Sequence, residues 1–282
     1  MLTKKIDFIA VLSVKKANPN GDPLGGNRPR EDINGYGEIS DVCLKRKIRN
    51  RWIDMGLSIF VQSDDKRSDE YSSLSERFNG ELKGITDGDA RSKAACEKWL
   101  DVRGFGQVFA YKKRDDNPEV SIGVRGPISI HPAFSVDTVD IEDIQITKSV
   151  NSEPTKDGQK SSDTMGMKHR VDFGLYVTKG SINVQLAEKT GFTDDDADKL
   201  HAALKTLFDN DASAARPEGS MVVEKLFWFE HNSKSGQYPT VKVHDSVVVS
   251  KKEGVVNPVS VEDFDIILKP LADLAVDIYS AR

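Results

Sequence analysis

The chain has 282 residues, of which 38% are hydrophobic and 30% charged, and its formal net charge is −5. This composition excludes a disordered chain, a collagen-like repeat and a membrane protein, because no stretch approaches the ~18 consecutive apolar residues of a membrane helix. The length predicts one domain with large insertions, or two domains. We identify no targeting segment, and Cys43 and Cys96 are too few for a disulfide framework or a zinc site, so we expect a cytoplasmic protein with reduced thiols.

Charge is distributed unevenly along the chain. Residues 42–51 hold five basic side chains and no acid, whereas residues 192–211 and 253–282 each carry a net charge of −4. A nucleic-acid-binding face needs only local positive charge, so the acidic total does not exclude one.

The N-terminal part begins with a strand, a long loop and a helix. Residues 6–14 alternate between an apolar face and a second face that is mostly apolar, which predicts a central strand. Residues 17–40 contain five Gly and three Pro, so we expect a loop, and a loop of this length is usually functional. Asp41 suits the N-cap of a helix over 42–55. Its apolar stripe is formed by Leu44, Ile48, Trp52 and Met55.

The remaining elements predict an α+β fold with an antiparallel sheet. In the first half of the chain we expect an inserted polar subregion over 63–92, a helix over 92–101 and strands over 104–112 and 121–131, which a hairpin-like tip at 112–118 joins. A protruding polar loop at 148–169 and a strand or hairpin at 171–187 follow. The last expected elements are a helix over 193–208, strands over 221–230 and 240–249, and a helix within 260–280.

The loop and the first helix together form the strongest candidate site. The loop offers donors from a glycine-rich backbone, and the helix projects cations on neighbouring faces, an arrangement that suits phosphates. The alternative interpretation is a solvated basic helix after a long loop. The residues concerned are Asn18, Asn20, Arg28, Arg30, Lys45, Arg46 and Arg49.

A second candidate is the string that runs from Arg103 to Ala110. It matches the signature of RNA-recognition strands at five positions but fails at Gln107 and Ala110. The alternative is an ordinary core strand in which Phe105 and Phe109 pack inward.

Two further segments carry candidate binding residues. Arg125 lies between Gly123 and Gly126, so it either meets a phosphate or is an exposed residue of a turn. Met165, Met167 and the following Lys168 end the polar loop; exposed methionines suit an adaptable contact with a partner or a base step, and the alternative is that they tuck back onto the sheet.

Signals for an enzyme are poor. The five His residues show no metal-ligand spacing, and neither a GxSxG nor a Walker A motif is present. We therefore expect no catalytic residue, metal or cofactor. Asp22 and Asp32 in the loop could bind a metal, although two loop acids are a weak signal.

Five strings nevertheless carry a resemblance to a known family. They are Asn18–Pro23 with Gly26–Arg30, Asp41–Asn50, and Asp101–Phe109 with Val124–Pro127. Over residues 5–130 the chain closely resembles the backbone subunit of type I CRISPR Cascade complexes, nearest to subtype I-C.

The resemblance implies a fold. It is a single modified RNA-recognition (RRM-like, ferredoxin-like) domain over 1–282, with an antiparallel palm, inserted fingers at 56–92 and a thumb at 145–170.

The resemblance also implies a function. Copies of the subunit would stack head to tail as a helical filament along the guide CRISPR RNA, with other Cascade subunits and without a membrane. Each thumb would kink the guide, the target DNA strand would pair with the guide segments, and the subunit would do no chemistry. Carried over by position, the loop and helix residues named above would contact the guide backbone. Related type III subunits cleave RNA with a loop Asp, so a metal-dependent ribonuclease that uses Asp22 or Asp32 is the alternative.

Overall fold

The computed structural model describes residues 1–111, 120–148 and 165–282. The expected hairpin tip at 112–118, and residues 149–164 of the expected protruding loop, lie outside these ranges. The chain is mixed α+β, and its main feature is an antiparallel sheet in which eight described strands take part, so the predicted fold class is confirmed at this level. Within the described ranges, no helix is long and apolar enough to cross a membrane.

Strand β1 (Ile6–Ala17) lies at the centre of the sheet, as its apolar faces predict. It pairs on one side with β11 (Met221–Glu230) and on the other with β10 (Met165–Ile182). Beyond these, β11 pairs with β14 and β10 pairs in succession with three short strands, one of which also pairs with β4. These outer strands are β14 (Ala275–Ser280), β7 (Ile128–Ile130), β8 (Ala133–Thr138), β9 (Ile141–Thr147) and β4 (Tyr36–Ile39).

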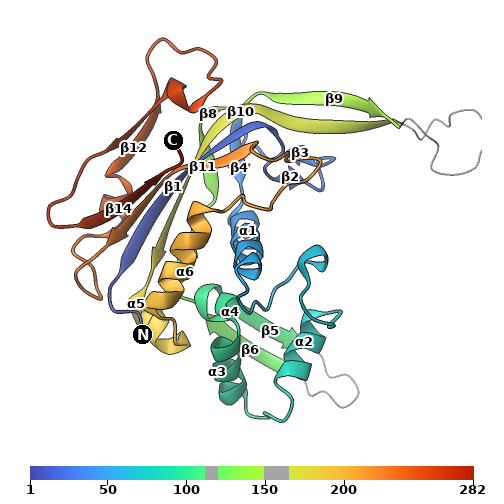
Figure 1. Ribbon diagram of the computed structural model, residues 1–282, viewed down its shortest axis with the longest axis vertical. Helices are drawn as coiled ribbons and strands as arrows, with labels where there is room; N and C mark the ends of the chain where they lie inside the picture. The colour runs from blue at the N-terminus through green and yellow to red at the C-terminus, as the bar shows by residue number, and fades with distance from the viewer. Residues whose placement is uncertain (112–119, 149–164) are drawn as a thin grey trace, which may run out of the picture.

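Three helices cover one face of this sheet: α1 (Asp41–Asp54), α5 (Val184–Thr190) and α6 (Asp194–Lys205) (Figure 1). Alternate side chains of a strand point to opposite faces, and Phe8 and Leu12 of β1 belong here to the same core as Trp52 of α1 and Leu200 of α6. The predicted stripe of α1 is buried except at Met55, which ends the helix and is exposed.

The opposite face of the sheet is covered as well. Ile9 and Val11 of β1 belong to a second core, shared with α7 (Thr240–His244), β12 (Val247–Lys251) and β13 (Phe264–Leu268). Because residues 6–14 of β1 are buried on both faces, a nucleic acid cannot lie on the middle of this sheet. Any binding surface must use its loops, edges and added elements.

A lower lobe forms a third core (Figure 1). Phe78 and Phe109 lie 4.4 Å apart between ring centroids, and Phe60 and Trp99 lie 4.7 Å apart. The lobe is built from η1 (Asp64–Lys66), α2 (Leu74–Glu81), α3 (Gly88–Lys98), α4 (Leu100–Phe105), β5 (Gly106–Tyr111) and β6 (Val120–Arg125).

An arm projects from the sheet where β1 ends. Ala17 of β1 is opposite Val171, so residues 165–170 of β10 extend past β1 and pair only with β9 among the described strands. The short strands β2 (Gly21–Asp22) and β3 (Arg28–Pro29) form a small hairpin beside the arm (Figure 1).

Two predicted elements near the C-terminus are wrong. The expected helix within 260–280 is a short 3-10 helix η3 (Val261–Asp263) followed by β13 and β14. Pro270 separates the two strands, and Phe264 is buried whereas Asp265 is exposed, which is a strand period. The expected strand at 240–249 is α7 followed by β12, with a turn at Asp245 and Ser246.

Other boundaries differ from those predicted. Ser40, not Asp41, is the N-cap of α1, and its side chain accepts a hydrogen bond from the Cys43 amide at 3.2 Å. The strand expected at 104–112 begins only at Gly106, because α4 runs to Phe105. The 171–187 segment is strand to Ile182 and then helix α5. The helix near 193–208 is confirmed, with a capping box between Thr193 and Asp196, and so is the strand at 221–230.

Candidate nucleic-acid interface

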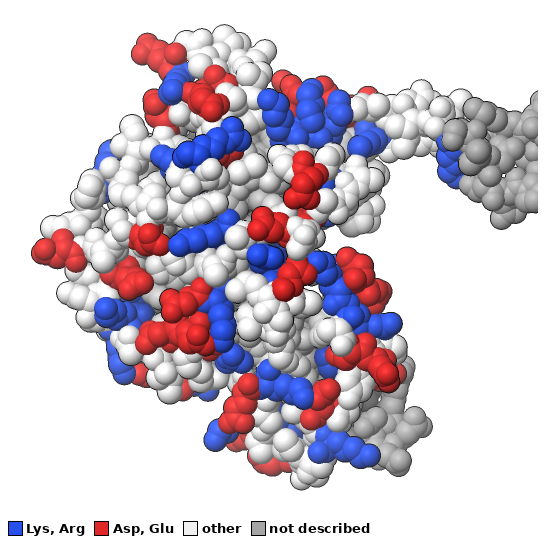
Figure 2. Space-filling model, viewed as in Figure 1, with Lys and Arg blue, Asp and Glu red and all other residues white. Residues whose placement is uncertain are grey.

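A hollow lies between the projecting arm and the lower lobe (Figure 2). The loop with β2 and β3, helix α1 and the segment between α6 and β11 lie together in this part of the molecule (Figure 1). The loop is joined to the base of the arm by the pair between Arg28 and Asp143 of β9, and to the start of α1 by the hydrogen bond between Asn20 and Ser40.

The two asparagines of the loop hold it in shape. Asn20 Oδ1 accepts hydrogen bonds from the Ser40 amide at 2.9 Å and from the Ser40 hydroxyl at 2.8 Å, which ties the loop to the start of α1. Asn18 is buried, and its Nδ2 donates to the Asn27 carbonyl at 2.6 Å. Both side chains thus fix the backbone.

The two loop arginines are partly exposed. Arg28, on β3, pairs with Asp143 of β9, and Arg30 lies 3.5 Å from Asp22. These ion pairs reach water, where each is worth about 1 kcal/mol or less. A phosphate could therefore replace either carboxylate at small cost.

The basic residues of α1 divide into exposed and buried groups. Arg46 has a side chain 54% exposed and lies 3.7 Å from Asp65, and Lys45 pairs with Asp41 at 2.9 Å one turn earlier. Arg49 is only 12% exposed; its Nε donates to the buried Asp101 at 2.9 Å, and its guanidinium lies over the Phe105 ring at 5.1 Å. Arg49 thus joins α1 to the lower lobe.

Arg103 also makes a structural contact, which joins α4 to α6. Its guanidinium makes two hydrogen bonds to Asp196 at the start of α6, at 2.7 and 2.9 Å. Residues 103–105 end a helix, so the string that matches the RNA-recognition signature does not lie on one strand. Phe109 is fully buried in the lower lobe, as the alternative interpretation expects.

Arg125 is exposed at the end of β6 and has no partner among the described residues. The two glycines beside it differ. A Cβ on Gly126 would lie 2.2 Å from the Gly104 carbonyl oxygen, whereas a Cβ on Gly123 would contact nothing within 4 Å. Gly126 is therefore required by a close backbone approach, and Gly123 is not.

The arm presents its methionines to solvent. Met165 and Met167 are 63% and 54% exposed, so they do not tuck back onto the sheet. Lys168 Nζ donates to the Ala214 carbonyl at 2.8 Å. At the base of the arm, Arg170 pairs with Glu142 at 2.7 Å and His169 with Asp143 at 2.6 Å.

Asp22 and Asp32 serve the turns of the loop. Asp32 Oδ1 accepts hydrogen bonds from the amides of Tyr36 at 3.0 Å and Asn34 at 2.8 Å, and these bonds lower the pKa of Asp32. Asp22 Oδ1 accepts from the Leu24 amide at 3.1 Å. In the described part of the chain, no group of three or more His, Cys, Asp or Glu side chains is placed to hold a metal ion.

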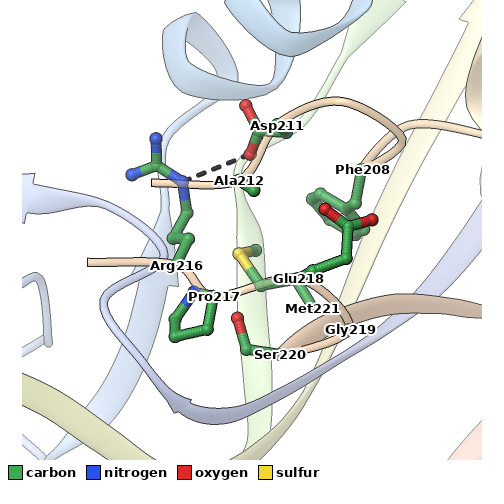
Figure 3. A pocket seen from close by; sticks show the side chains of 9 residues that line it. All are labelled: Phe208, Asp211, Ala212, Arg216, Pro217, Glu218, Gly219, Ser220 and Met221. Atoms are coloured by element: carbon green, nitrogen blue, oxygen red, sulfur yellow. Dashed lines mark hydrogen bonds and ion pairs between the residues drawn. The ribbon is translucent and has the colours of Figure 1, made fainter. Parts of the chain in front are cut away.

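Sequence reasoning missed one ionic cluster near the loop. Lys47 of α1 is buried and pairs with Asp211, which also accepts a hydrogen bond from Arg216 at 3.2 Å (Figure 3). Burial lowers the pKa of Lys47, and the charge of Asp211 opposes that shift. Asp211 lies 164 residues from Lys47, in a segment without periodicity, so no sequence signal pointed to this contact.

A family model described as CRISPR-associated protein Cas7 matches residues 4–269, which is nearly the whole chain. The chain belongs to this family. The resemblance that the loop and helix strings carry is thereby confirmed at the level of the family.

Individual Cas7 relatives are more distant. A CRISPR-associated protein Cas7 from Haloferax volcanii is 28% identical over 210 residues, which are 69% of this chain and 61% of that protein. The chain thus spans about three-fifths of that relative's length. Two solved chains come from CRISPR RNA-guided surveillance complexes, one of them described as pre-nicking. They are 17% and 16% identical with TM-scores of 0.48 and 0.42, and the matches cover 80% of this chain and 78% and 68% of theirs.

Proposed function

We propose that the chain is a non-catalytic subunit that binds guide CRISPR RNA and forms part of the backbone of a Cascade complex in antiviral defence. Membership of the Cas7 family over residues 4–269 is the observation that carries this proposal. The partly exposed basic side chains around the hollow support it, because sequence-independent RNA binding depends on phosphate contacts and stacking.

Within this proposal the candidate residues have different roles. Exposure and weak ion pairs favour Arg28, Arg30, Lys45, Arg46 and Arg125 as phosphate contacts. Asn18 and Asn20 would shape the loop that presents them, while Arg49 and Arg103 would hold the lower lobe to α1 and α6. The exposed Met165 and Met167, with Lys168, would be the contacts of the arm.

We also infer a ferredoxin-like palm. The succession β1, α1, β8, β10, α6 and β11, with the spatial order β11-β1-β10-β8, supports this assignment. The arm would be the thumb at 145–170. The fingers would extend from 56–92 to about residue 125, because β5 and β6 share the core of the lower lobe.

The proposal includes an assembly. Copies would stack head to tail along the guide in the cytoplasm, together with other Cascade subunits, and would present short guide segments for pairing with the target DNA strand. We place the chain nearest to subtype I-C on the strength of the loop and helix strings. A head-to-tail contact joins two unlike faces, and the uneven charge of the chain is compatible with that.

One experiment separates this function from a nuclease. Purified protein is mixed with end-labelled single-stranded RNA and Mg²⁺, and one tube is loaded on native and denaturing gels. We expect a ladder of retarded bands and RNA of unchanged length. If the wild-type protein shortens the RNA and Asp22→Ala or Asp32→Ala leaves it intact, the ribonuclease is established instead.

A further inference from the structure

The segment between α6 and β11, residues 206–220, contacts all three elements to which we assign RNA binding. The Ala215 carbonyl accepts a hydrogen bond from the Asn18 amide of the loop at 2.9 Å. The neighbouring Ala214 carbonyl accepts from Lys168 of the arm at 2.8 Å. Asp211 pairs with Lys47 of α1. The segment therefore lies where loop, arm and helix meet.

Asp211 fixes this segment to α1 through charge. Lys47 is 4% exposed and lies over the Phe208 ring at 5.6 Å, so its ammonium group has lost most of its water. A buried charge without its partner is costly, commonly by several kcal/mol. The carboxylate of Asp211 is therefore held beside Lys47, and the backbone that carries Asp211 is held with it.

The same carboxylate orients Arg216. Arg216 Nε donates to Asp211 at 3.2 Å (Figure 3). The backbones of Ser213 and Arg216 exchange two hydrogen bonds, at 2.8 and 3.0 Å, which close a tight turn. Arg216 and the exposed Arg46 line one cavity. In the described part of the chain, the two terminal nitrogens of Arg216 have no partner, so they are available to an anion.

We propose that Asp211 is a positioning residue for RNA binding, which holds the turn 211–216 against α1 so that Arg216 joins Arg46 as a phosphate contact. This inference rests on the proposed RNA-binding function. The competing explanation is electrostatic: Asp211 would be one more anion near the RNA and would simply weaken binding. The two explanations predict opposite signs when the charge is removed.

The test is Asp211→Asn, with the affinity for single-stranded RNA measured by fluorescence anisotropy at several salt concentrations. Positioning predicts a several-fold higher Kd. It also predicts a shallower salt dependence, in which the slope of log K against log salt decreases in magnitude by about 0.7 for each phosphate that the variant no longer neutralises. The electrostatic explanation predicts a lower Kd. The matched control is Asp209→Asn, which removes the same charge from the same segment; Asp209 is 59% exposed and lies 3.7 Å from Arg51, so we expect equal or tighter binding.

Further readouts separate positioning from a general loss of stability. Asp211→Glu keeps the charge and should recover most of the binding, and thermal unfolding of each variant shows whether it is folded. If Asp211→Asn does not fold, Arg216→Gln is titrated instead, because it removes the proposed phosphate contact and leaves the pair between Asp211 and Lys47 in place. A several-fold higher Kd for this variant supports the inference, and an unchanged Kd overturns it.

The remaining outcomes are also decisive. If Asp211→Asn binds RNA as tightly as Asp209→Asn, the inference is wrong and the proposed function stands. If the wild-type protein does not bind RNA at all, the proposed function fails and the inference fails with it.

Discussion

At the scale of single residues, two arginines three positions apart in α1 have different surroundings. Arg46 is mostly exposed, whereas Arg49 is almost buried against Asp101 and Phe105. The sequence predicts that both lie on a basic helix, but it does not predict which of them meets water. Asp101 lies 52 residues from Arg49, and only the packing of the lower lobe brings the two together.

Arg46→Ala should weaken RNA binding without affecting the fold. The side chain is exposed and only weakly paired, so the substitution removes one phosphate contact. We expect the slope of log K against log salt to decrease in magnitude by about 0.7, and the loss of affinity to be the same for different RNA sequences. Anisotropy titrations measure the slope, with Val42→Ala as the exposed control on the same helix. An unchanged slope would remove Arg46 from the interface.

Arg49→Ala should act mainly on stability. It leaves the carboxylate of Asp101 buried with two backbone amides, from Phe60 and Val61, as its remaining donors. We expect a loss of about 3 kcal/mol in the free energy of unfolding, since removal of one partner of a buried pair leaves the other charge uncompensated. Urea unfolding measures the loss. A fully stable variant that binds RNA poorly would show that Arg49 contacts RNA instead.

Asp7 gives a prediction about pH. Burial alone would raise the pKa of Asp7, but hydrogen bonds from His231 at 2.8 Å and from Lys5 outweigh burial, so the pKa of Asp7 is lowered from its ordinary value of 3.8. A lowered pKa in the folded state contributes stability that is present above about pH 4 and is lost as the pH falls further.

Asp7→Asn should therefore destabilise the protein by about 2 kcal/mol at pH 7, the usual worth of hydrogen bonds to a charged group. The difference from the wild type should shrink below pH 4. Urea midpoints across a pH series measure this, and a difference that stays constant down to the acid limit would contradict the assignment.

At the scale of elements, a helix or strand can be predicted from the sequence when the interactions that form it lie within its own segment. The helix near 193–208 is predictable because its capping box and apolar period lie within the segment. Strands β13 and β14 are not, because β14 exists through its pairing with β11, about fifty residues earlier. Pro270 is a local sign against a helix there. The loop asparagines show the same limit, since Asn20 and Ser40 meet only when the loop closes.

The junction between the lower lobe and the sheet offers a matched pair of variants. Gly126→Ala would place a Cβ 2.2 Å from the Gly104 carbonyl oxygen and 2.4 Å from the Gly106 amide nitrogen. We expect a loss of about 1–3 kcal/mol in the free energy of unfolding, because backbone must shift. Gly123→Ala, in open space on β6 three residues earlier, should cost nothing. Equal effects of the two variants in urea unfolding would contradict this account of the glycines.

At the scale of the whole molecule, a chain of net charge −5 is proposed to bind a polyanion. This requires binding through a few local cations, so salt should oppose it strongly. The five phosphate contacts proposed above predict a salt slope near −3.5, and hence about a 130-fold loss of affinity between 50 and 200 mM salt. Anisotropy titrations across that range measure it. Affinity that is insensitive to salt would mean that stacking, and not phosphate contact, dominates.

The central place of β1 also has a consequence for synthesis. This strand leaves the ribosome before its two partners, which begin at residues 165 and 221. Sheets built from such distant pairs fold slowly, and domains form only after their last strand is made. Until then, a nascent chain carries an apolar strand with two unpaired edges. Translation that stops between β1 and β11 should leave aggregation-prone fragments, so the supply of intact subunits depends on how quickly each chain is completed.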